Sequence, residues 1–491
     1  MVFSSIIFIF FFLPAVLLVF HILPDKFRFS FLLISSIFFY FYGESFLIWV
    51  MLTTTFIDYC CGIMIVNGFK KNQSLRLPEG GSRTKTQKIW LAVSIISNLG
   101  LLGYFKYFNF FGENLIRILD DMEISHLQLD GLINVSLPLG ISFYTFQSMS
   151  YTIDVYRGHV SANKSLINFS TFVTMFPQLI AGPIVRYSDV EDQMKNHRIY
   201  TDDFVVGIKR FITGLAKKVL IANTLALVAD QIFSLPSAEL SMGIAWIGIL
   251  SYSLQLYYDF SGYSCMAIGL GKMIGFNFPE NFNYPYISKS ISEFWQRWHI
   301  TLSTWFRDYL YFPLGGNRNG NFKTYRNLLI VFVTCGLWHG AEWNYLVWGL
   351  SLGFFLIIER FSFFRMFKKS PAIFQHVYML LAFNLTLVIF RVENLTDAFH
   401  YLGVLFGIGG KVTEMSVMTG YLQNNVILIA LISIMFSMPT YPYLKKKMEP
   451  LILKNVNLAN LIYLAVLLLL FILSTMSLAS GTYNPFIYFR F

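Results

Sequence analysis

The sequence predicts an all-α polytopic integral membrane protein. Hydrophobic residues make up 55% of the 491 residues and charged residues only 13%, whereas soluble domains are about 25% charged. The apolar residues also gather in runs that approach or reach the roughly 20 residues that a helix needs to cross a bilayer, and they give about 11 to 14 membrane segments. The clearest runs are residues 6–20, 46–66, 89–104, 244–258, 377–390, 426–438 and 458–473.

The charges lie mainly in the loops between these runs. A formal net charge of +10 would suit a nucleic-acid-binding protein, but no solvated basic domain is present in the sequence. Residues 70–88 hold six basic residues and one acid, and residues 360–369 and 445–454 are also basic, whereas residues 107–134 are acidic. The positive-inside rule places the basic loops in the cytoplasm and the acidic one outside. This alternation predicts that both termini lie outside, and no nucleic-acid partner is expected.

A single membrane domain is predicted over residues 1–491, with its motif-dense part at about 137–350. Residues 259–321 and 335–344 are rich in Gly, Asn and aromatic residues and predict irregular or re-entrant segments, which must be shielded from lipid or line a wet cavity. Six of the nine tryptophans lie in or just beyond these two stretches, which suggests a packed pocket. These are Trp295, Trp298, Trp305, Trp338, Trp343 and Trp348.

Two of the eight histidines, His299 and His339, lie in these stretches. Ionisable groups within a membrane are costly and are therefore functional candidates. If the basic loop ending near Asn327 is cytoplasmic, His339 lies about 18 Å across the bilayer. A neutral imidazole there suits a general base for a hydroxyl, and a histidine hydrogen-bonded within a helix bundle is the alternative. The 40-residue separation contains no paired histidine motif, so no metal site is predicted.

Charged groups near the tryptophans leave two interpretations open. Asp259 follows an apolar run and either orients a pocket or pairs with Lys272 or Arg297. The basic residues nearby could bind the phosphates of a cytoplasmic acyl donor, or they reflect the positive-inside bias. These basic residues are Arg297, Arg307, Arg318 and Lys323.

Residues 349–353, GLSLG, match the pattern of a nucleophile elbow. That motif requires a strand before it and a helix after it. Here it lies within one apolar run, residues 345–358. Small residues that pack helix against helix are therefore the better interpretation.

Residues 294–317, FWQRWHITLSTWFRDYLYFPLGGN, resemble the signature of the membrane-bound O-acyltransferase (MBOAT) family, and residues 336–340, GLWHG, resemble its catalytic-histidine motif. Four further stretches resemble the alginate O-acetylation branch of this family. They are residues 137–147, 176–184, the segment around Asp259 and residues 485–489. The likeness spans nearly the whole chain in family order.

The resemblance implies an MBOAT-like helical core, placed as a multi-pass protein in the bacterial cytoplasmic membrane. It implies a cytoplasmic approach for the acyl donor and an outer funnel for the acceptor. His339 would be the catalytic base, and His299 would orient the substrate or help form the reaction chamber. The motif residues expected to contact donor or substrate are Trp295, Arg297, Trp298, Trp305, Arg307, Trp338, Asp259 and Asn317.

The implied activity is transfer of acetyl from cytoplasmic acetyl-CoA to a hydroxyl on the outer side, without a bound cofactor. The product would be an O-acetylated extracellular or cell-wall polysaccharide, reached through an outer partner protein. Two alternatives lie within the family: D-alanyl transfer from a carrier-protein thioester to teichoic acid, and O-acetylation of peptidoglycan. A third is a transporter that moves an acetyl donor without chemistry, because transporters also have polar residues in discontinuous helices.

Overall fold

The computed structural model describes residues 1–67, 74–122, 135–411, 415–481 and 483–485. Every regular element in these ranges is a helix, which confirms the predicted fold class. The chain divides into two compact units. Unit 1 comprises Met1–Ile208 and Ala267–Pro279, and unit 2 comprises Lys209–Met266 and Glu280–Phe491. The single domain expected from the sequence stays a prediction.

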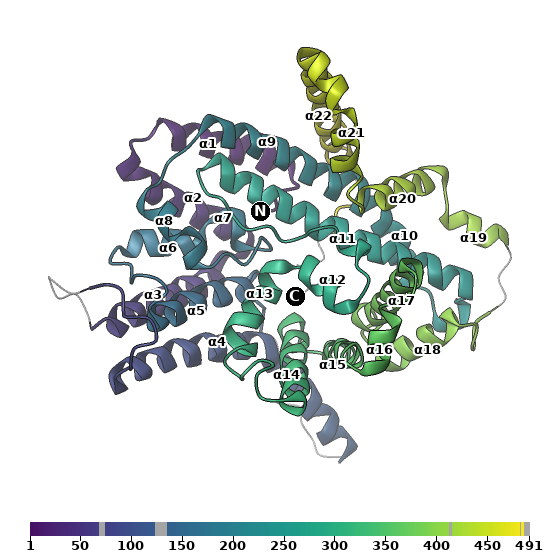
Figure 1. Ribbon diagram of the computed structural model, residues 1–491, viewed down its shortest axis with the longest axis horizontal. Helices are drawn as coiled ribbons and strands as arrows, with labels where there is room; N and C mark the ends of the chain where they lie inside the picture. The colour runs from purple at the N-terminus through teal and green to yellow at the C-terminus, as the bar shows by residue number, and fades with distance from the viewer. Residues whose placement is uncertain (68–73, 123–134, 412–414, 482, 486–491) are drawn as a thin grey trace. The chain divides into compact units, whose positions relative to one another are not determined.

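Unit 1 is built around the helices α3, α4 and α5, which pack against one another (Figure 1). Residues 107–121, expected in an outer loop, instead continue α4 as helix, and residues 123–134 of that loop lie outside the described ranges. The elements of unit 1 are η1 (Phe8–Phe12), α1 (Leu13–Ile22), α2 (Asp25–Glu44), η2 (Ser45–Leu47), α3 (Ile48–Ile65), α4 (Lys85–Asp121), α5 (Ile141–Arg157), α6 (Leu166–Thr174), α7 (Phe176–Leu179), α8 (Tyr187–Lys195), the start of α9 (Thr201–Ala216) and the end of α11 (Met242–Met273).

A buried carboxylate ties these three helices together. Asp58 on α3 is fully buried and accepts hydrogen bonds from Ser94 (2.6 Å) and Asn98 (2.7 Å) on α4. Ser148 on α5 donates to the same carboxylate. A buried carboxylate is tolerated only where such donors replace its water, so this network fixes the packing of α3, α4 and α5.

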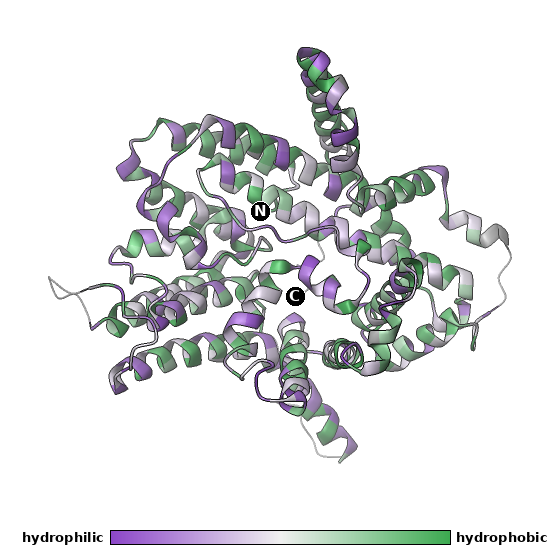
Figure 2. Ribbon diagram, in the orientation of Figure 1, coloured by the Kyte–Doolittle hydropathy of each residue, from purple (hydrophilic) through white to green (hydrophobic). Residues whose placement is uncertain are grey.

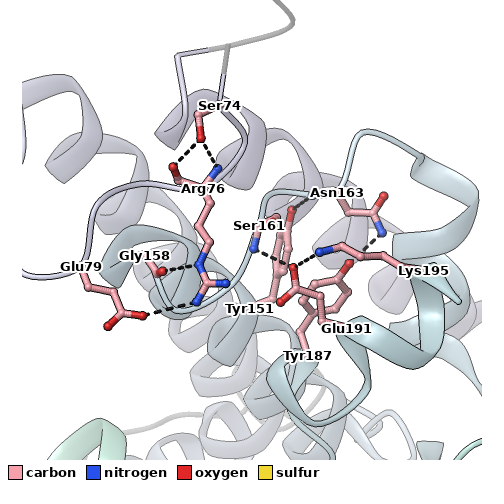
Figure 3. Close-up of polar contacts among 10 residues, drawn as sticks. All are labelled: Ser74, Arg76, Glu79, Tyr151, Gly158, Ser161, Asn163, Tyr187, Glu191 and Lys195. Atoms are coloured by element: carbon pink, nitrogen blue, oxygen red, sulfur yellow. Dashed lines mark hydrogen bonds and ion pairs between the residues drawn. The ribbon is translucent and has the colours of Figure 1, made fainter. Parts of the chain in front are cut away.

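The basic loop before α4 is hydrogen-bonded to the chain at the end of α5 (Figure 3). Arg76 donates to the carbonyl oxygen of Gly158 (2.9 Å), just beyond the last residue of α5. Nearby, Glu191 on α8 accepts from the main-chain N–H of Ser161 (3.0 Å) and from Lys195 (2.6 Å). Cations are favourable beside the carbonyl end of a helix, so this part of the predicted cytoplasmic loop has a defined place.

Unit 2 holds most of the motifs that the sequence singled out. Within it α14 and α15 lie side by side, and α17 packs on α15 (Figure 1). Its elements are the rest of α9 and of α11, η3 (Lys217–Ala222), α10 (Asn223–Phe233), η4 (Ser237–Glu239), η5 (Pro285–Ile287), α12 (Ile291–Arg297), α13 (Ile300–Phe306), η6 (Arg307–Tyr311), α14 (Asn321–His339), α15 (Trp343–Ile358), α16 (Ser362–Phe367), α17 (Ala372–Arg391), α18 (Leu395–Leu405), α19 (Met415–Tyr421), α20 (Asn424–Phe436), α21 (Thr440–Lys454) and α22 (Val456–Ala479).

Several helices present apolar surface that suits lipid. Figure 2 shows apolar residues along most of α22, where Leu461, Leu464 and Leu468 are 56–63% exposed. A large apolar surface of this kind is typical of a membrane contact. The chain is therefore a multi-pass membrane protein.

By length and composition, five described helices could cross a membrane, or six if the bent pair α20 and α21 counts as one span. The sequence predicted about 11 to 14 segments. The numbers differ because other predicted segments are shorter or more polar. Residues 6–20 lie in a short apolar helix, Phe8–Ile22, and residues 244–258 lie in α11, which carries Ser, Gln and Tyr side chains. The total number of crossings stays a prediction.

Candidate functional site

His339 is the last residue of α14 and is 6% exposed. Its ring meets three aromatic rings nearly at right angles. The ring centroids lie 4.9 Å from Trp338, 4.9 Å from Trp348 and 5.4 Å from Phe390. We call these four residues the aromatic cluster. The imidazole is thus held among apolar rings that come from α14, α15 and α17.

Two glycines allow α14 and α15 to approach closely enough to form this cluster. A Cβ on Gly336 would fall well inside contact distance of the carbonyl oxygen of Tyr345, and one on Gly349 would meet the carbonyl oxygen of Phe332 in the same way. Small residues of this kind permit close helix packing. The GLSLG stretch therefore lies in α15 as a packing surface, as predicted, and not as a nucleophile elbow.

Gly336→Ala is expected to separate α14 from α15 and to misplace His339. Overpacking of this kind costs about 1–3 kcal/mol, and a shift of about 1 Å near the reacting atoms can lower activity about 100-fold. Activity and thermal stability in detergent would measure both effects. Gly103→Ala on α4 is the matched control, because its new methyl group meets nothing within 4 Å. Equal behaviour of the two variants would contradict the packing role.

His299 lies at the N-terminal cap of α13 and is 1% exposed. Its φ of 42° is in the left-handed region that side chains other than glycine seldom adopt. The ring centroid lies 4.7 Å from Phe260 on α11 and 6.1 Å from Trp338 on α14. Trp338 therefore contacts both histidines, which are 40 residues apart in the sequence, and brings them to one place.

The other predicted tryptophans contact different aromatic rings. Trp295 lies 6.2 Å from Trp348 and so borders the aromatic cluster. Trp298 lies 5.7 Å from Phe383 on α17, and Phe294 contacts both Trp298 and Trp295. The ring of Trp305 lies 5.1 Å from that of Tyr309 in η6, with the two ring planes tilted by 42°. Trp295 therefore connects α12 to the aromatic cluster.

The predicted donor-binding cations have acidic neighbours. Arg297 donates to Glu293 (3.0 Å), one turn earlier on α12. Arg307 donates to Asp308 (2.7 Å), and this hydrogen bond raises the pKa of the guanidinium. Asn317 is exposed. Arg307 and Asn317 therefore lie at the surface. The role of the predicted residues in donor binding stays a prediction.

Asp259 has a different partner from those the sequence suggested. It lies 2.7 Å from Lys218 in a pair whose side chains are each 2% exposed. The predicted partners are engaged elsewhere, since Lys272 binds Asp203 (2.8 Å) and Arg297 binds its own helix. The prediction of Lys272 or Arg297 as the partner was therefore wrong. Lys218 lies in the π-helical segment η3, 41 residues earlier in the chain, and no spacing rule connects the two.

A carboxylate at the end of α15 fixes the start of α12. Glu359 is buried and accepts from the main-chain N–H groups of Ile291 (2.6 Å) and Ser292 (2.9 Å). Negative charge at a helix N-terminus is favourable because the first N–H groups lack partners within the helix. The contact holds in place the helix that carries Trp295 and leads to His299.

Sequence reasoning did not select three residues that contact the histidines. Phe260 and Phe390 pack on His299 and His339, and Asn281 binds His299 Nδ1 at 3.0 Å. Phe260 could have been found from its place beside Asp259. Phe390 and Asn281 carry no signal of this kind, because one apolar or amide residue in such a chain has no distinctive pattern.

Two imidazoles around one indole, within an apolar setting, form an arrangement that can take a proton from a hydroxyl and exclude water. The family model of the membrane-bound O-acyltransferases, MBOAT, matches residues 37–396 of this chain. The chain belongs to this family. The matched range includes His299, His339 and Asn281 together with both glycines of the helix contact. As a member of the MBOAT family, the protein is a membrane O-acyltransferase.

Among its relatives, the chain is 40% identical to the probable alginate O-acetylase AlgI of Azotobacter vinelandii, and the match covers 100% of both proteins. It is 38% identical to the peptidoglycan O-acetyltransferase of Helicobacter pylori over 72% of each chain. It is 31% identical to the teichoic acid D-alanyltransferase of Bacillus subtilis over 47% of this chain and 60% of that protein.

Proposed function

We propose that the protein transfers acetyl from cytoplasmic acetyl-CoA to a hydroxyl on the outer side of the bacterial cytoplasmic membrane. The transfer serves the O-acetylation of a polysaccharide through an outer partner protein. The observation that carries this proposal is the position of Trp338, whose ring contacts both His299 and His339. Relatives that match along the whole chain are named alginate O-acetylases, which supports acetyl as the group and a polysaccharide as the final acceptor.

In this proposal His339 is the general base. It takes the proton of the acceptor hydroxyl while the hydroxyl oxygen attacks the thioester carbon of acetyl-CoA. The carbon–sulfur bond then breaks, and the leaving thiolate takes from His339 the proton that came from the acceptor hydroxyl, which gives free CoA. The acetyl group ends as an ester on the acceptor. The aromatic cluster limits water, which would otherwise hydrolyse the thioester.

The donor reaches the site from the cytoplasmic side in this proposal, and both termini of the chain lie outside. Charge-assisted hydrogen bonds from arginine suit the phosphates of CoA. Arg307 is proposed for this contact because its side chain is 54% exposed. Arg297 and Asn317 would border the same approach, and Asp259 would support the site through its pair with Lys218.

Assays on purified protein in detergent test which acyl donor the protein uses. Acetyl-CoA and a D-alanyl carrier-protein thioester are supplied separately, with alginate oligosaccharide, peptidoglycan fragments or an outer-side extract as acceptor. Release of free CoA together with ester formation is expected only from acetyl-CoA. Turnover of the carrier thioester alone would support D-alanyl transfer instead, and turnover of neither donor would favour a transporter. Ester on peptidoglycan but not on alginate would support peptidoglycan O-acetylation instead.

A further inference from the structure

Asn281 is buried at the point where His299 begins α13. It is 1% exposed, and its side-chain oxygen lies 3.0 Å from His299 Nδ1, 2.9 Å from Thr301 Oγ1 and 3.3 Å from the main-chain nitrogen of Thr301. Its side-chain nitrogen donates to Ser264 Oγ on α11 (3.0 Å). Its main-chain oxygen accepts from the N–H of Ile300 (3.0 Å). The amide side chain thus binds both the start of α13 and α11.

These contacts determine which way the Asn281 amide points. The two ends of an asparagine amide are assigned from their hydrogen-bond partners. The main-chain N–H of Thr301 can only donate, so the atom that faces it must be the carbonyl oxygen. A reversed amide would direct its NH₂ group at that N–H. The oxygen of Asn281 therefore also faces His299 Nδ1.

The orientation of the amide determines the proton position on His299. A carbonyl oxygen can only accept, so Nδ1 of His299 must carry the proton and donate it to Asn281. In the neutral ring Nε2 is then the basic nitrogen. The ring is further held by the Phe260 ring, whose centroid lies 4.7 Å away with the two planes nearly at right angles, and by the left-handed backbone at His299 itself. A non-glycine residue stays in such a backbone only when its surroundings fix it.

We propose that Asn281 is a positioning residue that holds His299 as the Nδ1–H tautomer, so that Nε2 accepts a hydrogen bond from a polar hydrogen of the acceptor other than that of the reacting hydroxyl. His299 then orients the acceptor so that the reacting hydroxyl faces the thioester, while His339 removes the proton of that hydroxyl. This inference rests on the proposed function. It gives His299, whose role the motif alone leaves open, the task of a hydrogen-bond acceptor for substrate.

The choice of an amide over a carboxylate follows from this task. A carboxylate beside an imidazole favours the charged form of the ring, in which both nitrogens are donors and Nε2 can no longer accept. Asp259, which precedes Phe260 on α11, is held in its pair with Lys218. Asn281 fixes the proton on Nδ1 without adding a negative charge.

Two substitutions of Asn281 test whether it fixes the tautomer of His299. Asn281→Leu removes the acceptor at similar volume and is expected to lower kcat about 10- to 100-fold with little change in the KM for acetyl-CoA. Asn281→Asp keeps an acceptor oxygen but adds charge. Its activity should be low at neutral pH and recover at higher pH, with the acid limb of the pH profile raised by about one pH unit or more.

The control is Thr301→Val, which removes one hydroxyl from the Asn281 oxygen but keeps the His299 contact, so its pH profile should match the native one. His339→Ala is measured in the same series. If it retains full activity, the proposed function fails whatever Asn281 does. If His339→Ala is inactive while Asn281→Leu is fully active and Asn281→Asp keeps the native pH profile, the proposed function stands and this inference is overturned.

Discussion

Replacement of His339 by alanine is expected to lower the rate of acetyl transfer by about 10²–10⁴-fold, the usual contribution of a general base. The substitution removes the imidazole and its ring contacts from the aromatic cluster but keeps the close backbone approach of α14 and α15 at Gly336 and Gly349. The variant should therefore insert and purify normally. Release of free CoA from acetyl-CoA in the presence of acceptor is the measurement.

His159→Ala provides the matched control for this result. The His159 side chain is 50% exposed in unit 1, and its ring lies 3.6 Å from Asp154. Its loss should leave CoA release within about twofold of the native rate, as is usual for an exposed position away from the chemistry. Full activity of His339→Ala would contradict the assignment of the base.

The second large effect is expected at the buried pair of Lys218 and Asp259. Each side chain is 2% exposed, and Lys218 also donates to Asn223 (2.9 Å) and to the main-chain oxygen of Pro485. Removal of one partner leaves an uncompensated buried charge, which costs about 3–5 kcal/mol. Lys218→Met and Asp259→Leu should each lower the thermal midpoint sharply in detergent and reduce the yield of folded protein.

The double variant separates a charge effect from a simple packing effect. Replacement of a whole buried pair by apolar residues is often neutral or stabilising, so Lys218→Met with Asp259→Leu should recover much of the lost stability. Glu79→Gln, which breaks only an exposed pair with Arg76, should cost less than about 1 kcal/mol. Additive losses in the double variant would contradict the account of a mutually dependent pair.

The sequence predicted those features that produce a recognisable pattern in the order of residues. Long apolar runs predicted the helical membrane fold, and the motifs around His299 and His339 predicted both candidate histidines. The contact of both rings with Trp338 could not be predicted, because it depends on how α13 and α14 pack. The GLSLG stretch was assigned correctly to helix packing because no strand pattern precedes it.

Other features could not be predicted from the sequence because they depend on tertiary contacts alone. The partner of Asp259 is a lysine in η3, and local charge counts favoured nearer cations. Asn281 lies within an irregular stretch rich in Pro and Asn, where nothing in the order of residues marks the one side chain that binds His299. Runs of apolar residues also say little about how many helices are long enough to span, which is why the predicted segments outnumber the long apolar helices.

The most direct test of the account follows acetyl and CoA across a sealed membrane. Radiolabelled acetyl-CoA is enclosed in proteoliposomes on the side of the basic loops, and alginate oligosaccharide with an outer-side extract is supplied outside. If the protein transfers acetyl across the membrane through the reaction itself, labelled ester should appear outside and an equal amount of free CoA should stay inside. Both should be lost in His339→Ala. Intact acetyl-CoA emerging outside, with no ester and no dependence on His339, would contradict transfer through the reaction itself and identify a conduit.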